Sequence, residues 1–568
     1  MTRFSVWAPR RDRVRLVLGS ATHDMRRDDR GWWHADADGP DYAFLLDDED
    51  QPLPDPRSRW QPAGVHGPSR RYSHDAFAWT DQRWTGRPLA GSVIYELHIG
   101  TFTERGTFDA ALERLDHLVE LGVDLVEVLP VNAFDGTAGW GYDGVLWGAV
   151  HEPYGGPDAF KRFVDACHAR GLGVLLDVVY NHLGPSGAYL DRFGPYFAGR
   201  TIWGPALNLD GPDSDEVRRY VIDNALGWLR DFHLDGLRLD AVHALVDRSA
   251  THLLEELAGE VDALAGGLRR PLHLIAESDL NDPRLVTSRD AGGYGLAAQW
   301  CDDLHHALHV ALTGETDGYY LDFGAPGALP ATLRQAFFHA GTWSSFRGRT
   351  HGRPIDPRRH SGHRFLIYLQ NHDQIGNRAR GDRMTATISP ARMLCGAAIV
   401  LCSPYTPMIF MGEEWAASTP WQFFASFADA DLAASVRDGR REEFAEHGWG
   451  SAEVPDPMDE ATLARSTLRW GELNEPGHRE VLETYRALIA LRRAHPELAD
   501  PRLDRFTVHA GDSWLVLHRG ERRAVVNLGT TDARILLDRR PTEVLLASAT
   551  PELTGTHLRV PPESFAVV

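Results

Sequence analysis

Short runs of apolar residues, broken by aspartate, glycine and proline, mark the beginning of the chain. The runs lie at residues 4–7, 14–18, 32–33 and 42–45. Within most of them apolar and polar positions alternate, as they do in strands with one face on a core and the other in water. The pattern predicts an all-β module, a β-sandwich, over residues 1–85.

From residue 86 onward, apolar runs alternate with amphipathic helical patterns. These runs lie at residues 93–97, 123–129, 174–179, 236–242, 273–276, 295–300, 365–369 and 407–411. Strands buried on both faces and separated by helices are typical of parallel sheets, and eight of them close a (β/α)8 barrel. We therefore predict the α/β class, with a TIM barrel over residues 86–500 that a helix over residues 479–494 closes. Further short runs at residues 513–518, 523–527 and 544–546 predict a small C-terminal β domain over residues 501–568.

Two helices of the barrel are expected to bury one apolar face each and to end at a glycine. The first face consists of Leu112, Leu115, Leu118 and Val119, before Gly122. The second face consists of Phe160, Phe163, Val164 and Cys167, before Gly171.

The charge balance excludes several classes of function. Lys+Arg number 59 and Asp+Glu 80, a formal net charge of −21, so we predict no nucleic-acid partner. Only one of the basic residues, Lys161, is a lysine. It follows Phe160 in a helical pattern and is predicted to lie on the solvated face, which argues against Schiff-base chemistry. The sequence also contains no phosphate-binding G-x-x-x-x-G-K loop.

The first residues lack the apolar run of a signal peptide, and no stretch approaches the ~18 apolar residues of a membrane helix. The four cysteines, at positions 167, 301, 395 and 402, form no C-x-x-C pair and are expected to be reduced and mostly buried. We predict a cytoplasmic protein without a membrane partner, and either a monomer or a homodimer.

Four acidic residues follow or interrupt apolar runs at the carboxyl ends of predicted strands: Asp177, Asp240, Glu277 and Asp373. In a TIM barrel the chemistry lies at this end of the strands. A charge in such a position is costly unless it is paired or functional. The structural alternative is a network of buried salt bridges that includes Arg238, two residues before Asp240.

Several carboxylates in one site suit glycoside hydrolysis or metal-assisted hydrolysis. A retaining glycosidase needs an ionised carboxylate and a protonated carboxyl group ~5–5.5 Å apart. Arg238 would keep Asp240 ionised, whereas apolar neighbours and Asp240 would favour the protonated form of Glu277. Asp373 could stabilise the positive charge of the transition state.

Three histidines lie close to these acids in sequence: His182, His243 and His372. They are candidates for sugar-hydroxyl donors or for metal ligands. None of these three histidines has H-x-x-x-H spacing or a cysteine partner that would support zinc, so we predict neither a metal nor a cofactor.

Four segments resemble the conserved regions of the α-amylase family of glycoside hydrolases, in the right order and on the right strands. They are Asp-Val-Val-Tyr-Asn-His at 177–182, Gly-Leu-Arg-Leu-Asp-Ala-Val-His at 236–243, Ala-Glu-Ser-Asp at 276–279 and Gln-Asn-His-Asp-Gln-Ile-Gly-Asn at 370–377. The resemblance spans roughly residues 1–568, because residues 4–9 are similar to the start of the β-sandwich that precedes the barrel in branching and debranching relatives. That sandwich is of the carbohydrate-binding-module type.

The resemblance implies that Asp240 is the nucleophile, Glu277 the general acid/base and Asp373 the transition-state stabiliser. It further implies that Arg238, His182 and His372 hold the sugar in the −1 subsite, with Tyr142 stacking there. Asn181 matches a calcium-ligand position of the family, but the accompanying acids are not found. The complete set of expected substrate-binding residues is Arg238, His243, His182, His372, Tyr142, Asp177, Asp302, Asp303, His305, His306, Gln374 and Asn377.

Within the family, residues 276–282, 299–306, 202–208 and 410–415 most resemble the members that release trehalose from maltooligosyltrehalose. The resemblance suggests that residues 302–306 line the acceptor side; the alternative for His305 and His306 is a helix N-terminus with one histidine packed inside. We predict a retaining hydrolase of the α-1,4 bond next to a terminal trehalose, with maltooligosyltrehalose and α-glucan oligosaccharides as partners. The alternatives are a branching, debranching or amylase-type enzyme, and a glucan-binding protein with an inactive barrel.

Overall fold

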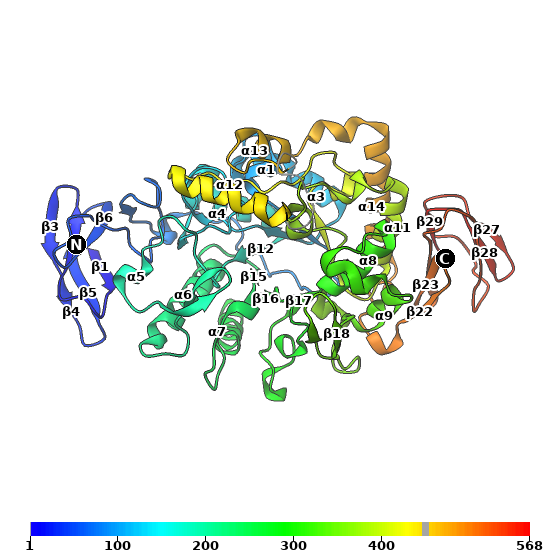
Figure 1. Ribbon diagram of the computed structural model, residues 1–568, viewed down its shortest axis with the longest axis horizontal. Helices are drawn as coiled ribbons and strands as arrows, with labels where there is room; N and C mark the ends of the chain where they lie inside the picture. The colour runs from blue at the N-terminus through cyan, green and yellow to red at the C-terminus, as the bar shows by residue number, and fades with distance from the viewer. Residues whose placement is uncertain (1, 446–453) are drawn as a thin grey trace.

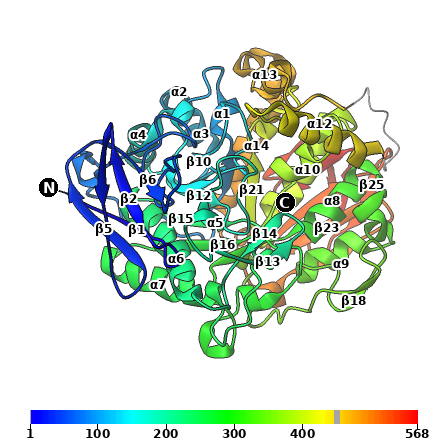
Figure 2. The same ribbon diagram turned by 60° about the vertical axis from the view of Figure 1, so that its left-hand side comes forward.

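A computed structural model describes residues 2–445 and 454–568. The N-terminal strands lie at one end of the long axis, the C-terminal strands at the other, and the barrel between them (Figure 1). Figure 2, turned to bring the N-terminal end forward, shows helices around the outside of the barrel strands.

The central part of the chain is a closed barrel of eight parallel strands. In chain order they are β8 (Ile94–Leu97), β9 (Leu125–Val128), β12 (Gly173–Val178), β15 (Gly236–Leu239), β16 (His273–Ala276), β17 (Ala298–Trp300), β20 (Phe365–Ile367) and β21 (Thr406–Phe410). Each coincides with one of the eight apolar runs, so the predicted TIM barrel is confirmed. Long helices around it include α4 (Gly156–Ala169), α6 (Ser214–Asp231), α7 (Leu253–Leu268), α8 (Asp302–Thr313), α11 (Pro390–Cys402) and α14 (Pro476–Ala494).

The barrel interior changes from apolar to polar along the strands. A buried layer that includes Ile94, Leu125, Leu175 and Ile275 fills it at the level of the amino-terminal halves. Because side chains alternate along a strand, the next inward positions lie two residues further on. These positions are Glu96, Glu127, Asp177 and Glu277, next to Arg238 on β15. The apolar layer therefore supports a polar layer at the carboxyl end.

The first predicted helix is interrupted. It consists of α2 (Phe108–Ala111), a 3₁₀ turn and α3 (Leu115–Leu121). Of the predicted face, Leu115 and Leu118 are buried and Leu112 is half-buried, but Val119 is 43% exposed, so the prediction for Val119 is wrong. The 3₁₀ turn rotates the following residues because it has three residues per turn rather than 3.6. Gly122 does end the helix, with a φ of 94° that favours glycine.

Helix α4 buries the four predicted residues, but the prediction for its neighbour Lys161 is wrong. Lys161 is fully buried, and its ammonium group donates a hydrogen bond of 2.9 Å to the carbonyl oxygen of His74. Four aromatic rings lie 5.2–5.7 Å from the ammonium nitrogen, those of Tyr72, Phe77, Trp79 and Phe232. Residues 72–79 cover this part of the helix, and helical periodicity does not reveal a covering segment from elsewhere in the chain.

Antiparallel sheets form both ends of the molecule. The N-terminal strands form two sheets, one of β1 (Thr2–Trp7), β5 (Trp32–Ala37) and β4 (Arg26–Arg27), the other of β3 (Ala21–Asp24), β2 (Val14–Leu18), β6 (Asp41–Leu46) and β7 (Ser69–Arg70). The C-terminal five-stranded sheet has the order β22 (Thr507–Ala510), β23 (Trp514–Arg519), β24 (Arg522–Asn527), β29 (Ser564–Val567) and β26 (Leu546–Ala547), and a three-stranded sheet has β25 (Ala533–Leu536), β28 (His557–Val560) and β27 (Glu552–Thr554). These sheets confirm the two predicted β modules. The domain limits near residues 85 and 500 stay a prediction.

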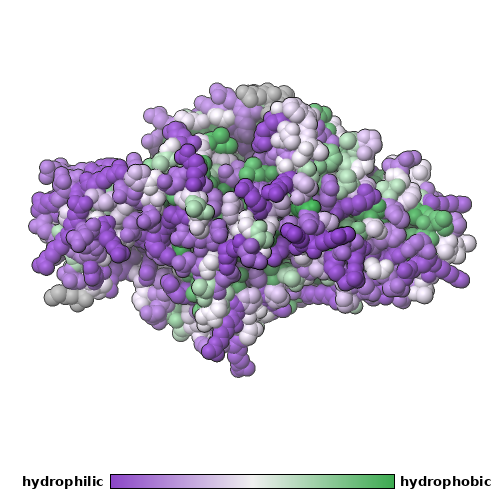
Figure 3. Space-filling view, turned by 90° about the horizontal axis from the view of Figure 1, so that it is seen from below, coloured by the Kyte–Doolittle hydropathy of each residue, from purple (hydrophilic) through white to green (hydrophobic). Residues whose placement is uncertain are grey.

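The four cysteines are free and buried, as predicted. Hydrophilic residues cover most of the face shown in Figure 3, with hydrophobic residues in small groups between them. Among the helices of residues 2–445 and 454–568, none is long and apolar enough to cross a membrane.

We expect Lys161→Met to lower the free energy of unfolding by about 1–3 kcal/mol, because it removes a charged hydrogen-bond donor and its aromatic contacts. Urea unfolding measures the loss. The control is Arg162→Met on the next position, whose exposed ion pair with Asp109 is worth less than about 1 kcal/mol. Equal losses in the two variants would contradict a stabilising role of the enclosed ammonium group.

Candidate active site

Three neighbouring strands bring the predicted acids to one level of the barrel. Asp177 on β12 is the register partner of Arg238 on β15. Leu239 on β15 is the partner of Ala276 on β16, so Asp240 and Glu277 are the next residues on adjacent strands. Because adjacent strands lie about 4.8 Å apart, this placement suits the carboxyl separation of a retaining glycosidase.

Arg238 is fully buried and links three carboxyl groups. Its Nη1 donates to Asp177 Oδ2 at 2.8 Å and to Asp240 Oδ1 at 2.6 Å, and its Nη2 lies 3.7 Å from Glu277 Oε2. The guanidinium group also lies over the ring of Trp300, 4.3 Å from its centroid. Burial nevertheless raises the pKa of Asp177 to about 6, because the loss of water outweighs the attraction of Arg238.

Both carboxylate oxygens of Asp240 accept a charge-stabilising hydrogen bond. Arg238 donates to Oδ1, and Asn181 Nδ2 donates to Oδ2 at 2.6 Å. The next residue, Ala241, has a φ of 38° in the left-handed region, which an alanine adopts only at a cost of about 1–2 kcal/mol. In this conformation its backbone N–H donates to Glu277 Oε2 at 2.5 Å. The strained residue thus connects the two central acids.

The environment of Glu277 favours its protonated form. Burial raises the pKa of Glu277 well above its usual value, and the negative charges of Asp240, Asp302 and Asp373 raise it further, against the opposing effect of Arg238. A carboxyl group that keeps its proton at neutral pH can serve as a general acid.

Tyr142 and His372 close another side of the cluster. The Tyr142 hydroxyl donates to Asp177 Oδ2 at 2.6 Å and accepts from His372 Nε2 at 2.7 Å, and the two rings stack with centroids 5.1 Å apart. His372 Nδ1 donates to Glu96 Oε1 at 2.6 Å. Although burial lowers the pKa of His372, Asp373 and Glu96 together raise it to about 9. His372 is therefore a cation at neutral pH.

The acids differ in their access to solvent. The side chains of Asp240 and Glu277 are 12% and 14% exposed, whereas that of Asp373 on α10 (His372–Gly376) is 40% exposed. Asn377 Nδ2 lies 3.4 Å from Asp373 Oδ1. This gradient places Asp240 and Glu277 at the bottom of the site and Asp373 near its opening.

His182 and His243 lie at the margin of the acid cluster. His182 Nε2 is 3.0 Å from the carbonyl oxygen of Tyr142. His243 Nε2 is 3.8 Å from Asp279 Oδ1, and the His243 ring packs edge-on against Trp203.

The predicted residues of α8 point in different directions. Asp302 accepts a hydrogen bond from the Tyr368 hydroxyl, and burial raises the pKa of Asp302 to about 6. Asp303 Oδ2 accepts three bonds of 2.8 Å, from the backbone of Phe338 and His339 and from Asn281 Nδ2. Asp302 therefore belongs to the acid cluster, whereas Asp303 stabilises the loop that covers the helix.

His305 is 1% exposed, and its ring lies beside Tyr368, as the helix N-terminus alternative expects. His306 packs between Tyr319 and Phe323, with burial lowering its pKa to about 3. Gln374 and His305 line a separate small hollow of about 10 Å³. In the described residues, no hydrogen bond joins His305, His306 or Gln374 to the acid cluster.

A hairpin beside the acids was not predicted. It consists of β18 (Thr342–Ser344) and β19 (Arg349–His351). Arg347 Nη2 donates to Asp279 Oδ2 at 2.9 Å, two residues after Glu277. Trp343 and Phe346 on the same hairpin are 62% and 55% exposed. Two exposed aromatic residues between glycines 341 and 348 are the sequence signal that could have indicated a binding loop.

Glu96 and Glu127 were also missed, although each interrupts an apolar strand. Both are buried, and Glu96 holds His372 in its charged form. Asn181, the position that matches a calcium ligand, turns its amide nitrogen to Asp240. Throughout residues 2–445 and 454–568, no group of three or more histidine, cysteine, aspartate and glutamate side chains could hold a metal ion.

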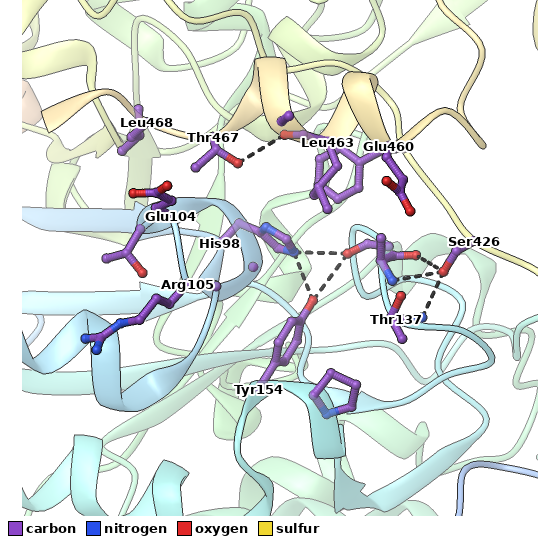
Figure 4. Close-up of a pocket in the computed structure, with 18 of the residues that line it drawn as sticks. His98, Glu104, Arg105, Thr137, Tyr154, Ser426, Glu460, Leu463, Thr467 and Leu468 are labelled. Carbon is purple, nitrogen blue, oxygen red and sulfur yellow. Dashed lines mark hydrogen bonds between the residues drawn. The ribbon is translucent and has the colours of Figure 1, made fainter.

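A separate cleft of about 1030 Å³ is lined in part by residues 137–139, which precede Tyr142 in the chain. Figure 4 shows His98 and Tyr154 at its centre, with His98 Nε2 3.1 Å from the Tyr154 hydroxyl. Ser426 Oγ accepts a hydrogen bond of 2.8 Å from the backbone N–H of Thr137, to the right of His98 in Figure 4. None of the predicted site residues lines this cleft.

Two family models match parts of the chain. "Alpha amylase, catalytic domain" matches residues 74–195, and "Domain of unknown function (DUF3459)" matches residues 501–567.

Curated relatives match over most of the chain. The malto-oligosyltrehalose trehalohydrolase of Arthrobacter ramosus is 59% identical and covers 88% of each chain. That of Rhizobium sp. (strain M-11) is 53% identical and covers 100% of this chain and 97% of the relative. That of Mycobacterium tuberculosis is 55% identical and covers 93% of each chain.

Solved structures agree with the fold. The crystal structure of a "Putative alpha Amylase" from Salmonella typhimurium is 38% identical and aligns with a TM-score of 0.91 over 100% of this chain and 97% of that chain. A pullulanase from Anoxybacillus sp. LM18-11, at 17% identity and a TM-score of 0.71, shares the fold alone.

We expect Arg238→Gln to lower the free energy of unfolding by about 3–5 kcal/mol at pH 8, because it leaves Asp177 and Asp240 as buried anions without their shared cation. At pH 5, below the Asp177 pKa of about 6, that carboxyl group is protonated and the loss is smaller. Urea unfolding at the two pH values measures the difference. The control variant, Arg219→Gln, removes exposed ion pairs and should lower the free energy of unfolding by less than about 1 kcal/mol at both pH values. A loss independent of pH would contradict this account.

Proposed function

This chain belongs to the malto-oligosyltrehalose trehalohydrolases of the α-amylase family, and on that premise we propose which of its residues carry the reaction. It is a glycosidase that hydrolyses the α-1,4-glucosidic bond next to the terminal trehalose of maltooligosyltrehalose, releasing trehalose and a shortened maltooligosaccharide. The observation that carries the assignment of roles is the pairing of Asp240 and Glu277 in opposite environments around Arg238.

In the first step Asp240 attacks the anomeric carbon of the glucosyl unit at the bond to be cleaved. Glu277 transfers its proton to the glycosidic oxygen, so that this bond breaks and trehalose leaves as a neutral molecule. The products of the step are a covalent glucosyl ester on Asp240 and an ionised Glu277. Support comes from the two hydrogen bonds that Asp240 accepts from Arg238 and Asn181 and from the raised pKa of Glu277.

In the second step Glu277, now a base, removes a proton from water as the water attacks the same anomeric carbon. The ester bond to Asp240 breaks, Glu277 is protonated again, and the glucan chain leaves with its original anomeric configuration. In the transition state of each step the sugar carries positive charge, and the carboxylate of Asp373 near the opening stabilises it.

The remaining residues position the sugar and the acids. We assign His182, His372 and Tyr142 to the glucosyl unit that is attacked, with the ring of Tyr142 as its stacking surface. Asp177 orients Arg238 and Tyr142, since it bonds to both. Asp177 is thus a positioning residue that acts through its neighbours.

On the acceptor side we assign Asp302, His306 and His243, together with the unpredicted Arg347 and Phe346. Asp302 contributes to the charge around Glu277, and Arg347 is bonded to Asp279 beside it. Four further residues are proposed to shape the acceptor side: Asp303, His305, Gln374 and Asn377. Asp303 and His305 do so by holding α8 and its covering loop in place.

We further propose that each chain acts without residues from another copy, as monomer or homodimer, since one barrel holds all three central acids. Four free cysteines favour a reducing compartment such as the cytoplasm.

Asp240→Asn should reduce kcat by several orders of magnitude with the fold intact, because an amide of the same shape cannot form the ester. Trehalose release and thermal unfolding measure the two properties. Wild-type turnover in a folded variant would exclude Asp240 as the nucleophile.

Glu277→Gln should stall hydrolysis of the natural substrate, because the leaving oxygen receives no proton. A substrate with an activated leaving group needs less acid, so its first step should suffer much less. Rates of leaving-group release from the two substrates test this. Equal damage to both would mean that another residue supplies the proton.

The specificity of the acceptor side is tested by comparing maltooligosyltrehalose with maltooligosaccharide of equal length. A site that bonds particular hydroxyl groups rejects misplaced ones by roughly 10⁴ or more, so the trehalose-capped substrate should be cleaved much faster. Asp302→Ala and His306→Ala should reduce this ratio more than they reduce hydrolysis of maltooligosaccharide. Equal cleavage of both substrates, or new α-1,6 branches in place of trehalose, would contradict the acceptor-side proposal.

A further inference from the structure

A strongly basic segment stands out against the acidic chain. Residues 347–364 contain six arginines, at positions 347, 349, 353, 358, 359 and 364, and one acid, Asp356, in a protein with a formal net charge of −21. Arg347 is held by Asp279 beside the active site. The established activity, on a neutral oligosaccharide, does not explain the rest of this concentration of positive charge.

Part of the segment forms a pocket of about 750 Å³ with the loops that follow β16. One wall consists of residues 283–292 and the other of residues 353–364. The guanidinium-bearing residues of the lining are Arg284, Arg353, Arg359 and Arg364. The volume lies in the range of small-molecule sites, which is about 300–1,000 Å³.

Two of these four arginines are neutralised by the protein itself. Arg284 lies 2.7 Å from Asp282, and Arg359 lies 3.5 Å from Asp356. These pairs leave the other two guanidinium groups as the uncompensated charge of the pocket.

Arg353 and Arg364 have no carboxylate partner within residues 2–445 and 454–568. For Arg353 no side-chain hydrogen bond or ion pair is formed in that part of the chain, and Arg364 donates to the carbonyl oxygen of Leu296 at 3.1 Å. Arg364 is half-buried, and burial lowers its pKa, as expected of a cation that has lost water without gaining an anion. The pocket therefore carries two positive charges that a ligand could neutralise.

The rest of the lining is polar or aliphatic. His360 Nε2 is 3.1 Å from Thr287 Oγ1, and this imidazole is the only ring system besides proline among the lining residues. Since bases bind by stacking on aromatic side chains, the pocket offers nothing to a nucleotide base. A hydroxyl-bearing group fits the lining better.

We propose that this pocket binds a phosphate monoester of a small polyhydroxy compound, with Arg353 and Arg364 as ligands of the phosphate. A phosphate monoester carries a charge of about −1.5 to −2 at pH 7, which matches two unpaired guanidinium groups. The planar guanidinium donates two parallel hydrogen bonds to phosphate oxygens, so both arginines suit a phosphate ligand. The volume beyond the phosphate accommodates the organic part.

The test is titration calorimetry of the full chain with glucose 6-phosphate, inorganic phosphate and glucose, at constant ionic strength set with NaCl. We expect glucose 6-phosphate to bind at least 10-fold more tightly than inorganic phosphate, and glucose not to bind at this site. Arg353→Met should weaken both phosphate-containing ligands at least 10-fold. The matched control is Arg358→Met, an exposed arginine of the same segment outside the pocket lining, which should change Kd less than 2-fold.

Three outcomes would overturn the proposal. Absence of phosphate-dependent heat would exclude the site, and unchanged binding in Arg353→Met would place the ligand elsewhere. Equal affinity for inorganic phosphate and glucose 6-phosphate would identify free phosphate rather than an ester as the ligand. Arg364→Gln repeats the test at the half-buried arginine. If the Arg364→Gln variant does not fold, Arg353→Met decides the test alone, because the Arg353 side chain is exposed and forms no hydrogen bond or ion pair in residues 2–445 and 454–568.

Discussion

One buried guanidinium group organises the active site. Arg238 has lost all contact with water, so its charge must be balanced by carboxylates within reach. Asp177 and Asp240 supply that balance through hydrogen bonds, and Glu277 lies just beyond hydrogen-bond distance. One cation cannot fully compensate three acids in a barrel of low polarity, and burial raises the pKa of Glu277, the acid with the weakest contact to Arg238, well above its usual value. The unequal contacts of Arg238 thus separate the roles of Asp240 and Glu277.

The barrel makes this arrangement possible at a tolerable cost. An apolar layer on the lower half of the strands stabilises the fold, while the polar layer above it contains groups that are expensive to bury. Beside the two central acids, strain lies at Ala241, where the left-handed backbone directs an N–H group at Glu277. The active site is therefore a region where stability is lower and geometry is well defined, as expected for preorganised catalysis.

Buried positive charge is stabilised in different ways elsewhere in the molecule. Lys161 is surrounded by aromatic rings and a carbonyl oxygen, which replace water around a compact ammonium group. Among residues 2–445 and 454–568, Arg364 has neither a carboxylate nor an aromatic ring as a partner, and its side chain donates to one carbonyl oxygen, that of Leu296. The positive charges of Lys161 and Arg238 are already compensated by groups of the chain. That of Arg364 is not, which is the reason to associate Arg364 with a ligand.

Local sequence determined the barrel strands, the two β modules and the positions of the four acids, since these depend on side-chain periodicity and on charges that interrupt apolar runs. Only the tertiary structure decided which residues face one another. The 3₁₀ turn before α3 exposed Val119, and residues 72–79 enclosed Lys161. Asp302 and Asp303 are adjacent in sequence, yet one joins the acids and the other holds a loop. The residues that pack against or bond to these side chains come from distant segments of the chain. Periodicity shows which face of an element is buried but not which segment covers it.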